Sequence, residues 1–177
     1  GKSRVVKDAL VSKGVIFYNR NDVDQALPIF KTVVKDYPTY EDSREAIVYT
    51  RNIYTQLDQV EVFEEWIDGL AFVDYSTQTR DSINYTAAAN KFFEGDYPSA
   101  MASLGKYLER FPNGVFKHSA HYYRAEIQFD RENYQEALAD YQEVNKMPFN
   151  QFSETSSQKA ADINFYYRNY VAALPNF

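Results

Sequence analysis

Five segments of this chain share one spaced pattern of small and aromatic residues, and this spacing constrains the fold more than any other feature. The clearest copy is centred on Ala137, with Tyr134 three residues before it and Tyr141 four residues after it. Equivalent reference positions are 26, 60, 100, 137 and 173, separated by 34, 40, 37 and 36 residues. A second site, usually a small residue, precedes each by twelve residues: Gly14, Val48, Ala88, Ala125 and Ala161.

The pattern predicts pairs of short antiparallel helices. Around Ala137, residues 120–141 read as the end of one amphipathic helix, a polar turn at 130–133 and the start of a second helix. Small residues allow the two helices to approach closely, and the tyrosines fill the space between them. A single pair cannot bury its own apolar face, so it needs copies on either side. An ordinary helical bundle with accidental periodicity is the alternative, but a bundle requires no shared spacing.

The spaced pattern of small and aromatic residues resembles the tetratricopeptide repeat over nearly the whole chain. Pro38 and Pro112, each twelve positions after a reference alanine, also fit this family's pattern. The resemblance implies an all-α, right-handed superhelical solenoid of antiparallel helix pairs, with about four and a half repeats. The second repeat is degenerate, and residues 74–80 are expected to form an insertion loop within a single array over residues 1–177. The expected repeats are residues 5–38, 41–73, 81–113, 115–149 and 153–177, the last of them truncated.

Both ends of the sequence favour a fragment of a longer chain. The sequence begins Gly1-Lys2-Ser3 without an initiator Met, and residues 174–177 would stop inside the second helix of a pair. A truncated last pair also makes self-association through the C-terminal repeat an expectation.

Composition excludes several classes of partner. The net charge is -6 with no basic run, which argues against nucleic acid or an anionic membrane surface as the ligand. No stretch approaches the roughly 20 apolar residues that a membrane-spanning helix needs. The chain has no cysteine, so disulfides and thiolate metal sites are excluded. Its unusual feature is 16 Tyr and 13 Phe, more than helix packing alone accounts for.

No catalytic or cofactor motif stands out. A glycine-rich phosphate loop, a nucleophile elbow and a His-Glu zinc helix are all missing. His118 and His121 lie on one helical face with Glu126 nearby, but no third ligand has the right spacing for a metal. A solvated helix start is the simpler interpretation. We therefore expect a non-catalytic protein with no cofactor and no metal.

The family resemblance also implies which positions face a concave groove, on the first helix of each pair. It places aromatic and acidic side chains there, and the residues we expect to bind a partner are Tyr18, Tyr49, Tyr85, Phe92, Tyr122, Glu126, Phe129 and Phe165. The full set of groove positions is Val11, Val15, Tyr18, Glu45, Tyr49, Asn52, Tyr85, Ala89, Phe92, Tyr122, Glu126, Phe129, Gln158, Asp162 and Phe165.

These positions lack the Lys/Asn clamp by which members of the family hold peptide C-termini. Glu45, Glu126 and Asp162 would repel a terminal carboxylate. The predicted partner is therefore an apolar protein segment with some basic character, held by a scaffold or adaptor.

Three alternatives remain open. The aromatic residues at these positions can instead pack between neighbouring first helices without any ligand. The array can also serve self-assembly, or act as an accessory domain of a cell-envelope complex. The Asp-Tyr and Asn-Tyr helix starts and aromatic-proline repeat ends are similar in style to bacterial envelope-associated repeat proteins, including the periplasmic component linked to the Tol–Pal system, so the periplasm is the expected compartment.

Overall fold

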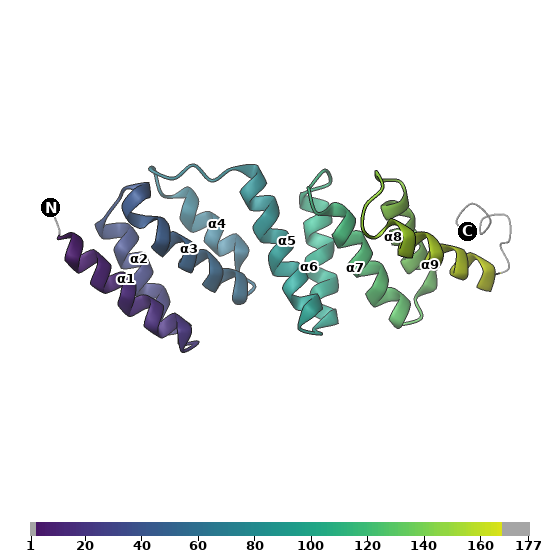
Figure 1. Ribbon diagram of the computed structural model, residues 1–177, viewed down its shortest axis with the longest axis horizontal. Helices are drawn as coiled ribbons and strands as arrows, with labels where there is room; N and C mark the ends of the chain where they lie inside the picture. The colour runs from purple at the N-terminus through teal and green to yellow at the C-terminus, as the bar shows by residue number, and fades with distance from the viewer. Residues whose placement is uncertain (1–2, 168–177) are drawn as a thin grey trace. The chain divides into compact units, whose positions relative to one another are not determined.

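The computed structural model describes residues 3–167, and all regular secondary structure in that range is α-helical. Successive helices form the pairs predicted from the spacing, so the all-α tetratricopeptide-like fold class is confirmed (Figure 1). None of the helices in this range is long and apolar enough to cross a membrane. The helices are α1 (Arg4–Asn19), α2 (Val23–Asp36), α3 (Tyr40–Gln56), α4 (Val60–Asp68), α5 (Thr77–Phe93), α6 (Tyr97–Arg110), α7 (Lys117–Asp130), α8 (Tyr134–Asn145) and α9 (Ser153–Tyr166).

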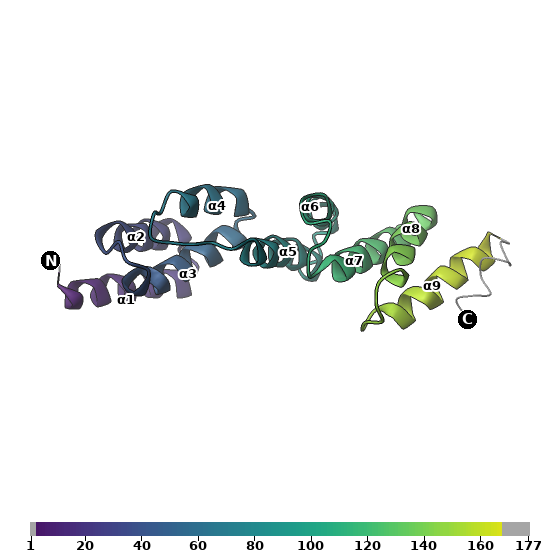
Figure 2. The ribbon, with the colours of Figure 1, turned by 90° about the horizontal axis from the view of Figure 1, so that it is seen from above.

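The chain forms two compact units, Gly1–Arg80 and Asp81–Phe177, hereafter unit 1 and unit 2. In unit 1, α1 and α3 lie in one layer, and α2 and α4 lie in the other (Figure 2). In unit 2, the helices α5, α7 and α9 share a layer, and α6 and α8 form the second (Figure 2). The first helices of the pairs thus lie beside one another within each unit.

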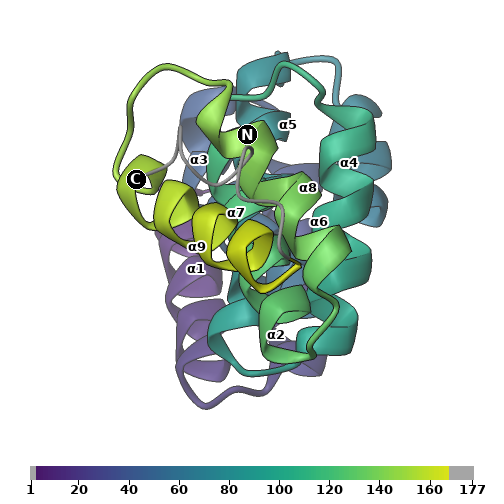
Figure 3. The same ribbon diagram turned by 90° about the vertical axis from the view of Figure 1, so that its right-hand side faces the viewer.

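Close contact between the small and aromatic repeat positions holds the pairs together. In unit 1, a Cβ built on Gly14 would lie 2.6 Å from Cε1 of Phe30, which is fully buried, so this site admits only glycine without rearrangement. In unit 2, Ala125, Ala137 and Tyr141 are all fully buried in one cluster. The α8 helix, which carries Ala137 and Tyr141, packs against both α7 and α9 (Figure 3). The predicted helix pairing therefore has the predicted contacts.

A set of hydrogen bonds around the buried Asp81 connects the third repeat to the start of the fourth. The hydroxyl of Tyr107 on α6 donates to Oδ1 of the buried Asp81 on α5 at 2.5 Å. The second carboxylate oxygen of Asp81 accepts from the Val115 N–H at 2.7 Å, and the Phe116 N–H donates to the Tyr107 hydroxyl at 3.2 Å. This arrangement satisfies the backbone of the loop that enters α7.

Several helix limits differ from the expectations. The predicted loop 74–80 lies earlier in the sequence than expected, because α4 ends at Asp68 and α5 begins at Thr77. The Ser76 hydroxyl caps α5 by accepting from the Thr79 N–H at 3.2 Å. The second helix of the degenerate repeat, α4, ends at Asp68 rather than near residue 73. The truncated second helix expected for the fifth repeat falls within residues 168–177, which lie outside the described residues.

Candidate partner-binding surface

A chain of touching aromatic rings runs between α5, α7 and the loop before α9 in unit 2. Phe93 contacts Phe92, Phe92 stacks on Tyr123, and Phe152 stacks on Tyr122, with ring centroids 5.5, 4.5 and 4.4 Å apart. Tyr123 joins the two halves, since its centroid is 5.8 Å from those of both Tyr122 and Phe152. We call these five residues the aromatic ladder. Phe93 is its exposed end, with 68% of its surface accessible, and the other four rings are partly buried.

The predicted site residues Tyr85 and Tyr122 each stack on an aromatic residue that immediately precedes the next first helix. Tyr85 lies parallel to Phe116 at 4.4 Å with planes 3° apart, and Tyr122 lies on Phe152 at 4.4 Å with planes 20° apart. Phe116 and Phe152 are the N-cap residues of α7 and α9. One face of each tyrosine is therefore covered by the neighbouring repeat, as the packing alternative requires, and both tyrosines remain partly exposed.

Burial changes the acidity of these tyrosines. It raises the pKa of Tyr85 to about 12, opposed by a hydrogen bond with Ser119 that favours the charged form. Burial also raises the pKa of Tyr122, and the nearby negative charge of Glu126 adds to the effect. Both hydroxyls are therefore neutral hydrogen-bonding groups at physiological pH.

The other predicted residues of unit 2 have more varied surroundings. Glu126 accepts a hydrogen bond from the Tyr141 hydroxyl at 2.5 Å, so its carboxylate also supports the repeat core. Phe129 contacts Tyr134 edge to face, with ring centroids 5.3 Å apart, and the Lys159 ammonium lies 3.7 Å from the Phe129 centroid. Phe165 on α9 is 60% exposed. Phe92 belongs to the aromatic ladder.

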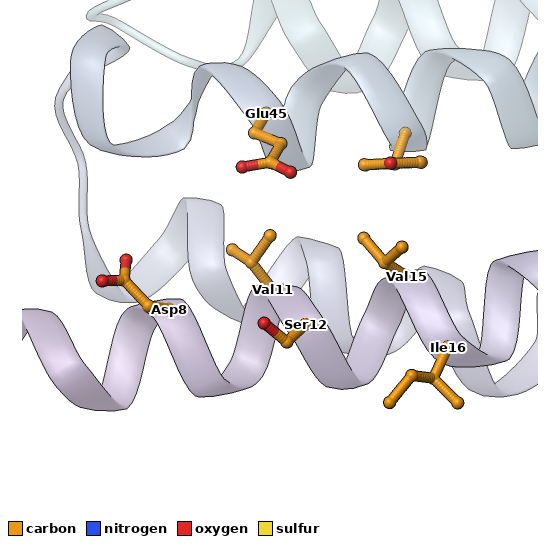
Figure 4. Close-up of a pocket in the computed structure, with 7 residues that line it drawn as sticks. Asp8, Val11, Ser12, Val15, Ile16 and Glu45 are labelled. Atoms are coloured by element: carbon orange, nitrogen blue, oxygen red, sulfur yellow. The ribbon is translucent and has the colours of Figure 1, made fainter.

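In unit 1 the predicted residues Tyr18 and Tyr49 contact each other across α1 and α3, with ring centroids 5.0 Å apart. Tyr49 also stacks on the buried Phe30, with ring centroids 4.9 Å and planes 5° apart. Beside Tyr49 is an open hollow of about 380 Å³. Its lining residues, drawn as sticks in Figure 4, are Asp8, Val11, Ser12, Val15, Ile16, Glu45 and Tyr49.

The two histidines have different partners in the structure. His118 lies near Phe152, with ring centroids 5.8 Å apart, and burial lowers the pKa of His118. His121 Nδ1 is 2.7 Å from Oδ1 of Asp140, which also accepts from Arg124. Among residues 3–167, no group of three or more His, Cys, Asp or Glu side chains is placed to hold a metal.

Sequence reasoning missed Phe116, Tyr123, Phe152 and Phe93. A signal for two of them exists, because Phe116 and Phe152 both lie 21 residues before a reference alanine. That position precedes the first helix, so helical periodicity alone does not point to it. Tyr123 and Phe93 each directly follow a predicted groove residue, at positions that we did not assign to the groove.

Comparison with protein families agrees with the helix-pair geometry. Tetratricopeptide repeat profiles match residues 85–146, which cover α6, α7, α8 and most of α5, and residues 8–40, which cover α2 and most of α1. The two matches together span just over half of the 177 residues. No curated protein sequence matches the chain significantly. On the repeat spacing, the packed helix pairs and these two matches, the chain belongs to the tetratricopeptide repeat family.

Proposed function

We propose that this protein is a non-catalytic scaffold that holds a segment of a partner protein against the first helices of its repeats. Tetratricopeptide repeats generally mediate protein–protein interaction and are generally not catalytic. The aromatic ladder of unit 2 is the surface we assign to the partner, together with the predicted residues Tyr85, Phe129 and Phe165 of the same unit.

The main support for the proposal is that the aromatic ladder is exposed at Phe93. Phe93 is 68% exposed, yet its ring touches both Phe92 and Tyr123, with centroids 5.5 and 5.4 Å apart. Tyr97, the first residue of α6, extends this apolar surface by contacting Phe92 at 5.8 Å. A single exposed apolar residue needs no explanation, whereas joined aromatic rings are typical of interaction surfaces.

The ladder favours an apolar segment for two physical reasons. Its rings are held in place by stacking, so little side-chain entropy is lost when a ligand covers them. Tyr122 and Tyr123 each combine an apolar ring with a polar hydroxyl group, a combination that suits contact with a peptide segment. Glu126, one helical turn from Tyr122, adds negative charge and favours a segment with basic character over an acidic one.

The proposal is tested by capture of partners from a native extract with wild-type protein and the variant Phe93→Ala. The matched control is Tyr40→Ala in unit 1, since Tyr40 is also a large exposed aromatic, with 53% of its surface accessible. We expect a protein that the wild type and Tyr40→Ala retain and Phe93→Ala loses, with an unchanged melting temperature for all three. Equal retention by all three proteins contradicts the proposal.

The style of the repeats also leads us to propose a bacterial envelope complex as the setting. Fractionation of cells expressing this protein tests the proposed setting, and recovery in the cytoplasm rather than the periplasm contradicts it. Self-assembly competes with partner binding, and light scattering over a range of concentrations separates the two. A protein that stays monomeric while it captures a partner supports the scaffold.

A further inference from the structure

We infer that the hollow between α1 and α3 in unit 1 is a pocket for a Lys or Arg side chain of the bound partner segment. This inference rests on the proposed function, because it assigns a chemical preference to one part of the partner. It concerns residues 8–49 and is independent of the aromatic ladder in unit 2.

The shape of the hollow suits a long side chain. It has a volume of about 380 Å³ and lies between the first helices of two successive repeats. Val11 and Val15 point from α1 toward α3, and Glu45 points back from α3 toward α1 (Figure 4). The ring of Tyr49, fixed by Phe30 and Tyr18, completes the apolar lining.

The charge of the hollow selects a cation. Asp8 and Glu45 both line it, and no Lys or Arg does. Within the part of the chain that the structure describes, Glu45 forms no ion pair. Asp8 forms only a long ion pair with Lys7, at 3.9 Å, because the Lys7 ammonium donates a shorter hydrogen bond to Asp42 at 2.9 Å. The exposed carboxylates of Asp8 and Glu45, which line the hollow beside apolar side chains, are therefore available for a positively charged ligand.

A Lys or Arg side chain matches both parts of this surface. Its aliphatic stem would cover Val11, Val15 and Tyr49, while its charged group would reach Glu45 and Asp8 in partial contact with water. Arg has the further advantage that its planar guanidinium can pair with a carboxylate through two hydrogen bonds and stack on an aromatic ring. An acidic segment would meet like charges and a neutral one would leave the carboxylates unpaired.

The experiment is a titration of the isotope-labelled full chain with three capped tripeptides, followed by NMR. The probes are acetyl-Ile-Arg-Ile-amide, acetyl-Ile-Gln-Ile-amide and acetyl-Ile-Glu-Ile-amide. We expect only the Arg peptide to shift the amide signals of Val11, Ser12, Val15 and Tyr49 in a saturable way. Its affinity should fall in high salt, because the pairing is partly exposed.

Variants of Glu45 make the test specific. Glu45→Gln should weaken the Arg peptide about threefold, and Glu45→Lys should abolish its binding and allow the Glu peptide to shift the same signals. The matched control is Glu41→Gln, since Glu41 is an exposed acid on α3 that does not line the hollow. Glu45 is exposed, so these changes should leave the circular dichroism spectrum and the melting temperature unchanged.

Three outcomes overturn the inference. The first is no saturable shift of the four signals with the Arg peptide at millimolar concentrations. The second is equal binding of the Arg and Gln peptides. The third is movement of these signals with protein concentration alone, which would place a second copy of the chain in the hollow. None of these results affects the ladder in unit 2, whose role depends on the separate capture experiment with Phe93→Ala.

Discussion

The rings of Tyr122 and Phe152 lie 4.4 Å apart with planes at 20°, so a residue in a predicted groove position is stacked on the residue that starts the next repeat. Tyr85 and Phe116 repeat this relationship one repeat earlier, with the same centroid distance. Such tyrosines link successive repeats and, through their remaining exposed surface, can also contact a partner. Fold stability and the proposed partner binding would thus be coupled at these sites.

The stack predicts a stability cost for Phe152→Ala. This change removes contacts with Tyr122, Tyr123 and His118, and should lower the free energy of unfolding by about 2 kcal/mol, less than a fully buried Phe because Phe152 is only partly buried. Urea denaturation measures it. Phe149→Ala is the control, since Phe149 is 87% exposed in the same loop and should change stability by less than about 0.5 kcal/mol. Equal effects of the two changes would contradict the structural role of the stack.

Replacement of Gly14 and of Gly105 by alanine should have opposite effects on stability. Gly14→Ala should destabilise unit 1 by about 1–3 kcal/mol, because the new methyl group would lie 2.6 Å from the Phe30 ring. Gly105→Ala, inside α6, should stabilise the protein by about 0.5–1 kcal/mol, because no atom lies within 4 Å of its Cβ position and alanine favours the helix. Chemical denaturation measures the free energy of unfolding of both variants and of the wild type. A neutral or stabilising Gly14→Ala would contradict the close helix contact.

The lowered pKa of Asp140 predicts that the folded protein loses stability in acid. It is only 2% exposed, and burial by itself would raise its pKa, but hydrogen bonds from His121 and Arg124 outweigh burial and lower it. Since the folded pKa lies below the unfolded value, this carboxylate stabilises the fold above about pH 4, and its contribution is lost as the pH falls through the lowered pKa. Asp140→Asn should therefore cost about 2 kcal/mol at pH 7 and much less near pH 2.

Unfolding measurements at both pH values, with the exposed Asp130→Asn as control, test this effect. A constant difference between wild type and Asp140→Asn at pH 7 and pH 2 would show that the carboxylate charge is not what stabilises the contact.

The raised pKa of Tyr85 predicts that the folded protein loses stability in alkali. Burial raises its pKa to about 12, above the usual value of 10.0, so the folded protein retains a proton that the unfolded chain loses. The resulting stabilisation is complete below about pH 10 and is lost as the pH rises toward 12. The difference in unfolding free energy between pH 9 and pH 11.5 should be smaller for Tyr85→Phe than for the wild type. If the unfolding free energy depends on pH equally in the two proteins, the Tyr85 hydroxyl does not cause the loss of stability.

Much of the fold was predictable from sequence, because the repeated spacing reports directly on which side chains touch. Gly14 and Phe30 are sixteen residues apart, as are Ala125 and Tyr141, and the same kind of contact forms in both repeats. Residues 74–80 were harder, because no repeat copy covers them. Their structure depends on a local hydrogen bond between Ser76 and Thr79, which starts α5 earlier than the repeat pattern indicates.

The candidate site was only partly predictable. The family resemblance placed Tyr85 and Tyr122 at groove positions of the first helices, but a one-dimensional pattern does not show that their rings lie against Phe116 and Phe152. Glu126 illustrates the same limit, because its hydrogen bond from Tyr141 depends on how two helices of one pair meet. Contacts between successive helices thus determine how much of each predicted groove residue remains exposed.

The most direct test of the central proposal is photo-crosslinking in cells with p-benzoylphenylalanine in place of Phe93, compared with the same probe in place of Tyr40. We expect a crosslinked partner peptide, identified by mass spectrometry, at position 93 and not at position 40, with apolar residues at the point of attachment. The same products from both positions, or none from position 93, would contradict the assignment of the aromatic ladder as the partner-binding surface.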